Sequence, residues 1–193
     1  MASNRKLPDW DISGVMPPVR PGAEGHSSDR SPYQVSLVDL VHRFAVSEER
    51  TRLLRSLLNY HISLHEAGLV SGFQWLDGSY MEHVEVLENR PPRDIDVVTF
   101  FHLPNGMTQQ SLAEAYPDIF NHNGVKEAFN IDSYYLPLGT SVEAISVRQL
   151  TYWYSMWSHR RTGQWKGFVQ VDLSPGEDLE AEKFLAAREE EYV

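Results

Sequence analysis

The chain has 193 residues, 41% of them hydrophobic, a formal net charge of −10 and no cysteine. This length and composition suit one domain with appendages and a packed core. The lack of cysteine excludes disulfides and thiolate metal sites, and the negative charge argues against a broad nucleic-acid-binding surface. No stretch approaches the roughly 20 apolar residues of a membrane span. Since the first residues also lack the apolar core of a signal peptide, we expect a cytoplasmic protein.

The two ends of the chain differ in composition from its middle. Residues 1–32 are rich in proline, glycine and serine and show no helical or strand period. This predicts an extended arm that Trp10 or Val15 pins to the body, and a disordered tail is the alternative. Residues 33–174 are expected to form the folded domain, and residues 175–193 an acidic C-terminal helix or tail.

The first half of the domain is predicted to be helical and then to enter a sheet. Apolar residues at three- and four-residue spacing predict helices over residues 36–45 and 47–67, and Ser47 is a suitable N-cap for the second. A strand is expected over residues 73–76, followed by a short helix after Ser79. The apolar run at residues 95–101 predicts a strand buried on both faces.

In the second half of the chain, predicted helices alternate with predicted strands. We expect a helix over residues 108–116 that Pro117 disrupts, a strand over 128–136, an aromatic-rich helix over 142–157, a strand over 168–173 and a solvated helix over 177–191. The alternation predicts an α/β (α+β) fold in which a small mixed sheet of about four to five strands is flanked by helices.

Two short motifs carry the chemistry. Gly78-Ser79 follows the first predicted strand, and Asp94-Ile95-Asp96 begins the second. Residues i and i+2 of a strand point to the same face, so Asp94 and Asp96 are expected to project together. Neighbouring carboxylates repel each other unless a cation lies between them, and Mg²⁺ prefers such oxygens. Glycine also permits a tight turn whose backbone N–H groups approach a phosphate.

A two-metal site needs a third carboxylate. Asp132 is the preferred candidate because its strand comes next in the chain after that of Asp94, and sequential strands usually neighbour each other. Asp172, near the end of the last predicted strand, is the rival.

Gly-Ser, a spacer, Asp-x-Asp in a strand and a later strand aspartate resemble the nucleotidyltransferase superfamily typified by DNA polymerase β. The resemblance covers roughly residues 70–136 and implies the polymerase β-like fold. It implies that Gly78 and Ser79 contact the triphosphate, and that two Mg²⁺ ions, with Mn²⁺ as a substitute, bind the three aspartates Asp94, Asp96 and Asp132. The fourteen residues between Ser79 and Asp94 form a slightly longer spacer than usual. The alternative is that Asp94 caps its strand with Arg93 as its ion-pair partner.

A basic segment, residues 157–167, is the second candidate region. We expect Arg161 and Lys166 to grip a triphosphate or an acceptor strand, and Trp165 to stack on a base. The alternative is a solvated loop that pairs with the acidic C-terminus. His61 and His65 have a spacing compatible with zinc, but no HExxH pattern accompanies them, so a polar helix face is the preferred interpretation.

The C-terminal segment ends in Tyr192-Val193. In size and layout the chain resembles small nucleotidyltransferases of antiphage defence, in particular the Hailong-type enzymes. This resemblance implies synthesis of DNA oligomers from deoxynucleoside triphosphates, primed on a hydroxyl of the enzyme's own C-terminal region, and Tyr192 would then be the primer.

The expected reaction is attack of a hydroxyl on the α-phosphate of a nucleoside or deoxynucleoside triphosphate, with release of pyrophosphate. The expected product is a short nucleic acid, and an effector protein is an expected partner. Two alternatives remain open: a toxin–antitoxin nucleotidyltransferase that modifies a protein or tRNA, and an inactive nucleotidyltransferase-like binding module that regulates an effector.

Overall fold

A five-stranded mixed sheet forms the centre of the molecule. The computed structural model describes residues 7–139, 141 and 143–192. The strands, in the order in which they lie in the sheet, are β1 (Tyr33–Gln34), β5 (Val169–Asp172), β2 (Gly72–Asp77), β3 (Ile95–Phe101) and β4 (Ile131–Pro137). β2 is antiparallel to both of its neighbours, whereas β1 and β4 run parallel to theirs. The expected mixed sheet flanked by helices is confirmed.

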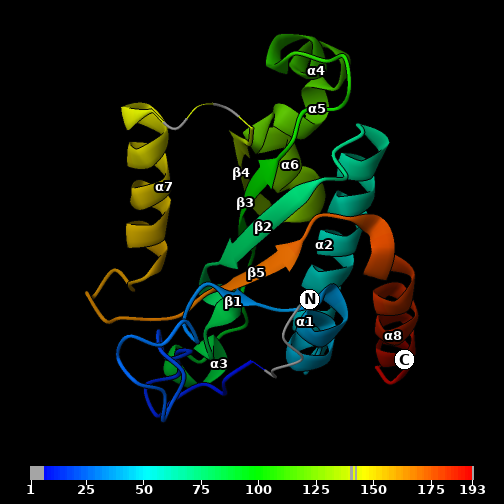
Figure 1. Cartoon of the computed structure of the whole chain (residues 1–193). Coiled ribbons are helices and arrows are strands. Elements are labelled where there is room, and N and C mark those ends of the chain that lie inside the picture. The colour runs from blue at the N-terminus through cyan, green and yellow to red at the C-terminus, as the bar shows by residue number, and fades with distance from the viewer. Residues whose placement is uncertain (1–6, 140, 142, 193) are drawn as a thin grey trace.

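Helices cover both faces of this sheet (Figure 1). α1 (Leu37–Phe44), α2 (Glu48–Glu66) and α8 (Asp178–Glu190) lie on one face, and α7 (Ala144–Trp157) crosses the other. Strand side chains alternate between the faces. Leu76, Val97 and Ile131 therefore join the larger core under α1, α2 and α8. Trp75, Val98 and Phe100 form a smaller aromatic cluster with Trp157 of α7.

α2 forms as its sequence predicts. The Ser47 side chain accepts a hydrogen bond from the backbone N–H of Arg50, and Glu48 and Glu49 occupy the positive first turn. Its apolar stripe is buried, with Leu53, Leu57 and Leu64 fully inaccessible.

The region between β3 and β4 differs from its prediction. It contains three helices, α4 (Gln109–Ala115), α5 (Pro117–Phe120) and α6 (His122–Phe129). Pro117 begins α5, since proline suits the first turn of a helix. The strand expected from residue 128 begins only at Ile131, because Ala128 and Phe129 complete α6. Asn130 then caps that helix in the left-handed conformation, with φ of +55°.

The remaining comparisons with the prediction concern short elements and the start of α7. The turn η1 (Ser79–Met81) follows β2, as expected, and α3 (Val84–Leu87) comes next. β1 was not predicted, because two residues carry no period. α7 was expected from residue 142, which lies outside the described residues. A second short turn, η2 (Pro175–Glu177), precedes α8.

Both ends of the chain, where described, pack against the sheet domain. Val15 and Met16 are buried, and the indole N–H of Trp10 donates to the carbonyl of Met81 at 2.8 Å. At the other end, Ala181 and Leu185 of α8 are fully buried in the larger core. The expectation of a solvated helix is therefore wrong for that side of α8. Among the helices in the described ranges, none has the length and apolar character needed to cross a bilayer.

Candidate functional site

Three aspartates lie side by side across three strands. Asp77 ends β2 opposite Asp96 of β3, and Asp96 in turn lies opposite Asp132 of β4. By the alternation of strand side chains, all three belong to the face that α7 crosses. Asp94 immediately precedes β3. The sheet register therefore brings together the three predicted aspartates and adds a fourth, Asp77.

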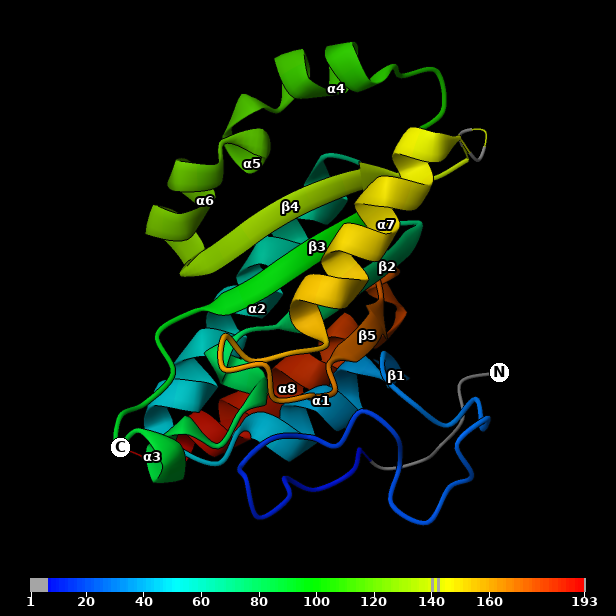
Figure 2. The same cartoon turned by 90° about the vertical axis from the view of Figure 1, so that its left-hand side faces the viewer.

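These aspartates line a cleft of about 690 Å³ at this end of the sheet. The opposite wall is formed by the end of α7 and the segment that leads from it toward β5, which Figure 2 shows running past the ends of the central strands. The lining residues are Asp77, Gly78, Ser79, Glu82, Glu88, Arg90, Arg93, Asp94, Asp96, Asp132, Met156, Trp157, His159, Arg160, Arg161, Thr162 and Lys166.

Lys126 of α6 bridges two of the cleft carboxylates. Its ammonium contacts Asp94 and lies 2.5 Å from Oδ2 of Asp132. Burial opposes the charge of Lys126, but Asp132 and Asp94 outweigh it and raise the pKa of the lysine. The ion-pair partner of Asp94 is thus Lys126, whereas Arg93, its expected partner in the capping interpretation, makes no ion pair among the described residues.

The central aspartate, Asp96, is largely buried between the other carboxylates of the cleft. Burial, followed by the charges of Asp94 and Asp132, raises the pKa of Asp96 to about 6. Lys126 acts in the opposite direction without cancelling these effects. A carboxylate in such surroundings favours any cation that enters between it and its neighbours. The cleft therefore offers a suitable oxygen-donor set for a hard divalent ion.

Gly78 allows the close approach of β2 to Asp96. Its backbone has φ of +82° and ψ of −167°, a region that is essentially restricted to glycine. A Cβ at this position would lie 1.9 Å from Oδ2 of Asp96. Ser79 follows directly and begins η1, and both residues line the cleft. The Gly-Ser motif and the Asp-x-Asp motif are therefore in contact in the fold.

Lys166, predicted to contact phosphate, lies at the bottom of the cleft in a buried ion-pair network. Its ammonium is 2.9 Å from Oδ1 of Asp77 and 3.0 Å from Oε1 of Glu82. All three side chains are nearly inaccessible. Burial raises the pKa of Asp77 to about 7 even though Lys166 opposes the shift. Lys166 thus has two protein partners already.

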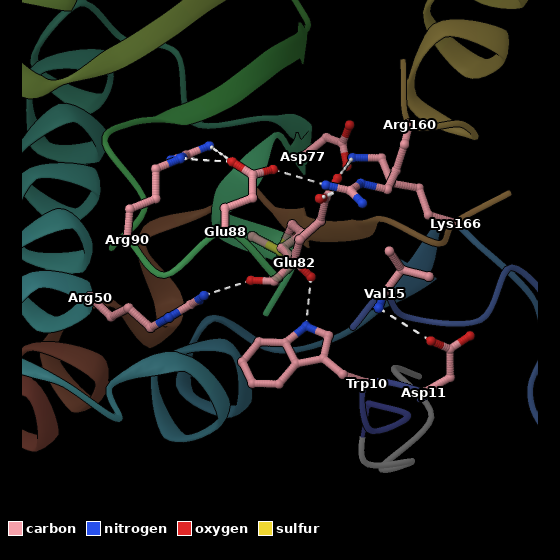
Figure 3. A network of polar contacts seen from close by, with 11 residues as sticks. Trp10, Asp11, Val15, Arg50, Asp77, Glu82, Glu88, Arg90, Arg160 and Lys166 are labelled. Atoms are coloured by element: carbon pink, nitrogen blue, oxygen red, sulfur yellow. Dashed lines mark hydrogen bonds and ion pairs between the residues drawn. The ribbon is translucent and has the colours of Figure 1, made fainter. Parts of the chain in front are cut away.

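Glu82 connects this buried lysine to the surface of the cleft (Figure 3). Its carboxylate also pairs with Arg160 at 2.9 Å, and Arg160 in turn contacts Glu88, which holds Arg90. Figure 3 shows that Arg50 and Trp10 approach the same segment from α2 and from the N-terminal arm.

Two cleft arginines remain without a carboxylate partner among the described residues. Arg161, predicted to grip phosphate, and Arg93 are both exposed and line the cleft. Trp165 is 59% exposed and packs on the ring of His159, with centroids 4.1 Å apart, but it is not among the lining residues. Arg93 and Arg161 are therefore the arginines, among the described residues that line the cleft, that remain available to an anion.

Two predicted site residues lie elsewhere. Asp172 is opposite Phe73, at the other end of β2 from Asp77, and accepts a hydrogen bond from the backbone N–H of Ser174. Tyr192 follows the end of α8 and does not line the cleft. Of the two rivals for the third carboxylate, only Asp132 is in the cleft.

His61 and His65 contradict the interpretation as a polar helix face. His61 is fully buried, and both rings lie close to Asp178, the first residue of α8. These groups are under the opposite face of the sheet from the aspartate cleft, in the layer of α2 and α8.

Several residues that line the cleft or contact its carboxylates were not predicted from the sequence. Asp77 directly precedes Gly78 and lies on the same strand face as Trp75, two positions earlier. Its place next to the Gly-Ser motif could therefore have been predicted from the sequence. Lys126 and Glu82 gave no such signal, since Lys126 belongs to a helix that was not predicted and Glu82 to a segment without a period.

A family of unknown function, DUF6932, matches residues 8–172, and the chain belongs to this family. The matched range includes all residues that line the cleft, whereas Asp178 and Tyr192 lie beyond it. No curated protein and no solved structure matches the chain.

Proposed function

We propose that this member of the DUF6932 family is a metal-dependent nucleotidyltransferase. In the proposed reaction a hydroxyl oxygen attacks the α-phosphorus of a nucleoside or deoxynucleoside triphosphate and forms the new P–O bond. The bond to the leaving pyrophosphate breaks, and the hydroxyl proton passes to Asp132 or to water. The observation that carries this proposal is the convergence of Asp94, Asp96 and Asp132 in one cleft, in contact with Gly78-Ser79.

The carboxylates fit a pair of Mg²⁺ or Mn²⁺ ions. Asp94, Asp96 and Asp132 would hold them. Burial, together with the charges of Asp94 and Asp132, raises the pKa of Asp96, and a bound cation would favour its ionised form. Bound ions of this kind lower the pKa of an attacking hydroxyl and neutralise a triphosphate. Lys126 now bridges two of these aspartates, and its side chain is 35% exposed, so it can turn toward solvent when an ion enters.

The chain's own cations and backbone would position the nucleotide. Gly78 and Ser79 lie next to Asp96, where a phosphate bound to the carboxylate-held cation would meet the turn into η1. Arg93 and Arg161 line the cleft without carboxylate partners and would bind the outer phosphates. A cytoplasmic location, with access to cellular nucleotides, is part of the proposal and suits a chain without cysteine.

Tyr192 is the acceptor that the chain itself offers for the synthesis of a DNA oligomer in antiphage defence. Its side chain is 37% exposed at the end of α8. Two contacts fasten this end: Arg55 pairs with Glu189 at 2.7 Å, and Arg188 donates to the carbonyl of Ala45. Self-priming in one molecule therefore requires the last turn of α8 to detach and reach the cleft.

A nucleotide screen tests the proposed reaction. The protein is incubated with each of the eight labelled ribo- and deoxynucleoside triphosphates and Mg²⁺ or Mn²⁺, and the products are separated on nucleic-acid and protein gels. We expect metal-dependent incorporation that Asp96→Asn abolishes and that Asp172→Asn, a matched change on the same sheet outside the cleft, leaves intact. Equal activity of both variants, or no incorporation with any triphosphate, would refute the proposal.

Intact-mass spectrometry then identifies the acceptor. An added nucleotide mass that disappears in Tyr192→Phe but persists in Tyr152→Phe, another exposed tyrosine, would identify Tyr192 as the primer. Label on tRNA or on another protein, with no mass added to the enzyme, would reject self-priming while retaining nucleotidyl transfer.

A further inference from the structure

A second group of metal-ligating side chains lies on the other face of the sheet. His61 and His65 are one turn apart on α2, and Asp178 begins α8, which Figure 1 shows beside α2. One potential ligand atom from each of the three lies within 4.8 Å of the others. Nδ1 of His65 is 3.1 Å from Oδ2 of Asp178, and Nδ1 of His61 is 4.0 Å from Oδ1 of the same carboxylate.

The outer nitrogens of both rings have hydrogen-bond partners. Nε2 of His65 lies 2.8 Å from the carbonyl oxygen of Leu173, which can only accept, so this nitrogen carries a proton. Nε2 of His61 hydrogen-bonds Oε1 of Gln74, whose amide nitrogen donates to Oγ1 of Thr99. In neutral rings with this arrangement, both Nδ1 atoms present lone pairs to the Asp178 carboxylate.

Two of the facing atoms have no hydrogen-bond partner. Nδ1 of His61 and Oδ1 of Asp178 are both buried and unpartnered among the described residues, and the His61 side chain is 0% exposed. A lone pair that faces a carboxylate oxygen is unfavourable, and buried polar atoms without a hydrogen-bond partner destabilise the fold. A cation between them would satisfy both atoms at once.

We propose that His61, His65 and Asp178 form a zinc site that joins α2 to α8. Two imidazole nitrogens and one carboxylate are a familiar donor set for zinc. Bonds of about 2.0–2.1 Å place tetrahedral ligands about 3.3 Å apart, so small side-chain movements would bring the observed separations into range. The hydrogen bonds to Leu173 and Gln74 supply the outer-shell contacts that orient zinc-binding histidines.

The site would fasten the C-terminal helix to the domain. Zn²⁺ would connect the C-terminal part of α2 to the first residue of α8, and through the Leu173 carbonyl to the chain just after β5. His65 and Asp178 retain side-chain exposures of 13% and 24%, so a fourth ligand can come from solvent. This inference does not depend on the proposed nucleotidyl transfer, because the two groups of ligands lie on opposite faces of the sheet.

Calorimetry on the full chain tests the site. Metal-free protein is titrated with Zn²⁺ in excess Mg²⁺, which occupies oxygen-donor sites but competes poorly for imidazole. We expect one Zn²⁺ per chain. His65→Gln and Asp178→Asn should each weaken its binding on the order of 100-fold, whereas His102→Gln, at an exposed histidine away from the cluster, should leave it unchanged. Circular dichroism checks that each variant is folded.

Thermal unfolding of the unmodified chain provides a measurement that needs no variant. Because Zn²⁺ would bind the folded state, it should raise the Tm of the native chain, and a chelator should reverse the increase. The proposal is overturned if Zn²⁺ has no effect on Tm or does not bind. It is also overturned if Zn²⁺ binds equally well to folded His65→Gln and Asp178→Asn, in which case the cluster is an ion pair between Asp178 and a protonated histidine.

Discussion

Two lysines each bridge two carboxylates of the cleft region, but their surroundings differ. Lys166 lies between Asp77 and Glu82 with a side-chain exposure of 5%, and Lys126 lies between Asp94 and Asp132 with an exposure of 35%. A buried lysine that compensates two buried carboxylates is part of the folded structure, because its removal leaves those charges unpaired. A lysine at an accessible cleft is weakly held and can be exchanged for another cation.

Asp96 lies between the two pairs. It is next to Asp77 on one side and Asp132 on the other, and both lysines act to lower its pKa without preventing the net increase. The difference in exposure between the lysines therefore suggests that they have different roles. Lys166 stabilises the buried base of the cleft, whereas Lys126 lies between Asp94 and Asp132, two of the carboxylates that we propose bind a divalent ion.

The largest expected effect is on stability. Lys166→Met should lower the free energy of unfolding by about 3–5 kcal/mol at pH 8, because Asp77 and Glu82 remain buried without their shared cation. Lys126→Met should change it by less than about 1 kcal/mol. Urea unfolding of both variants measures the difference, and equal losses would show that the two lysines are not distinct in role.

A smaller loss is expected where the turn approaches Asp96. Gly78→Ala should lower the free energy of unfolding by about 2–4 kcal/mol. Alanine avoids this backbone conformation, and its Cβ would contact the Asp96 carboxylate. Gly106→Ala is the matched control, since Gly106 has φ of +80° but nothing within 4 Å of the added Cβ, and it should cost about 1–2 kcal/mol. Similar losses in the two variants would mean that Gly78 does not position Asp96.

The pH dependence of stability should reveal the contribution of the Asp96 carboxylate. The pKa of Asp96 is about 6 in the fold against an ordinary 3.8, so between these values the folded state holds more protons than the unfolded state. Stability should therefore fall as pH rises through this window. Asp96→Asn removes that loss, and between pH 4 and pH 7 it should gain roughly 1–3 kcal/mol relative to the native chain.

Denaturant unfolding in EDTA at both pH values measures this gain, with Asp172→Asn as the control that should show none. Added Mg²⁺ should stabilise the native chain and not Asp96→Asn, which would reverse their ranking at neutral pH. If the difference in stability between Asp96→Asn and the native chain stays constant with pH, the pKa of Asp96 is not raised in the fold.

The parts of the site that were predictable from sequence are those set by local pattern. Strand alternation placed Asp94 and Asp96 together, and the tendency of sequential strands to neighbour each other favoured Asp132 over Asp172; the register between β3 and β4 shows the strands adjacent. Lys126 was not predictable, because it contacts Asp94 and Asp132 from α6 and this contact depends on the packing of that helix. The burial of His61 was missed for a related reason: its partner Asp178 is more than a hundred residues away.

The smallest effect is expected for Arg161, in the wall of the cleft, and should appear in ligand binding and not in stability. Arg161 is exposed and lacks a carboxylate partner among the described residues, so Arg161→Ala should leave stability unchanged. If it meets the triphosphate, the same change should weaken nucleotide binding about three- to tenfold, and less so at high salt. Calorimetry with a non-hydrolysable triphosphate and Mg²⁺ measures this, with Arg148→Ala on the exposed side of α7 as the control. Equal affinities for the two variants would remove Arg161 from the binding site and leave Arg93 as the remaining unpaired arginine in the described part of the cleft.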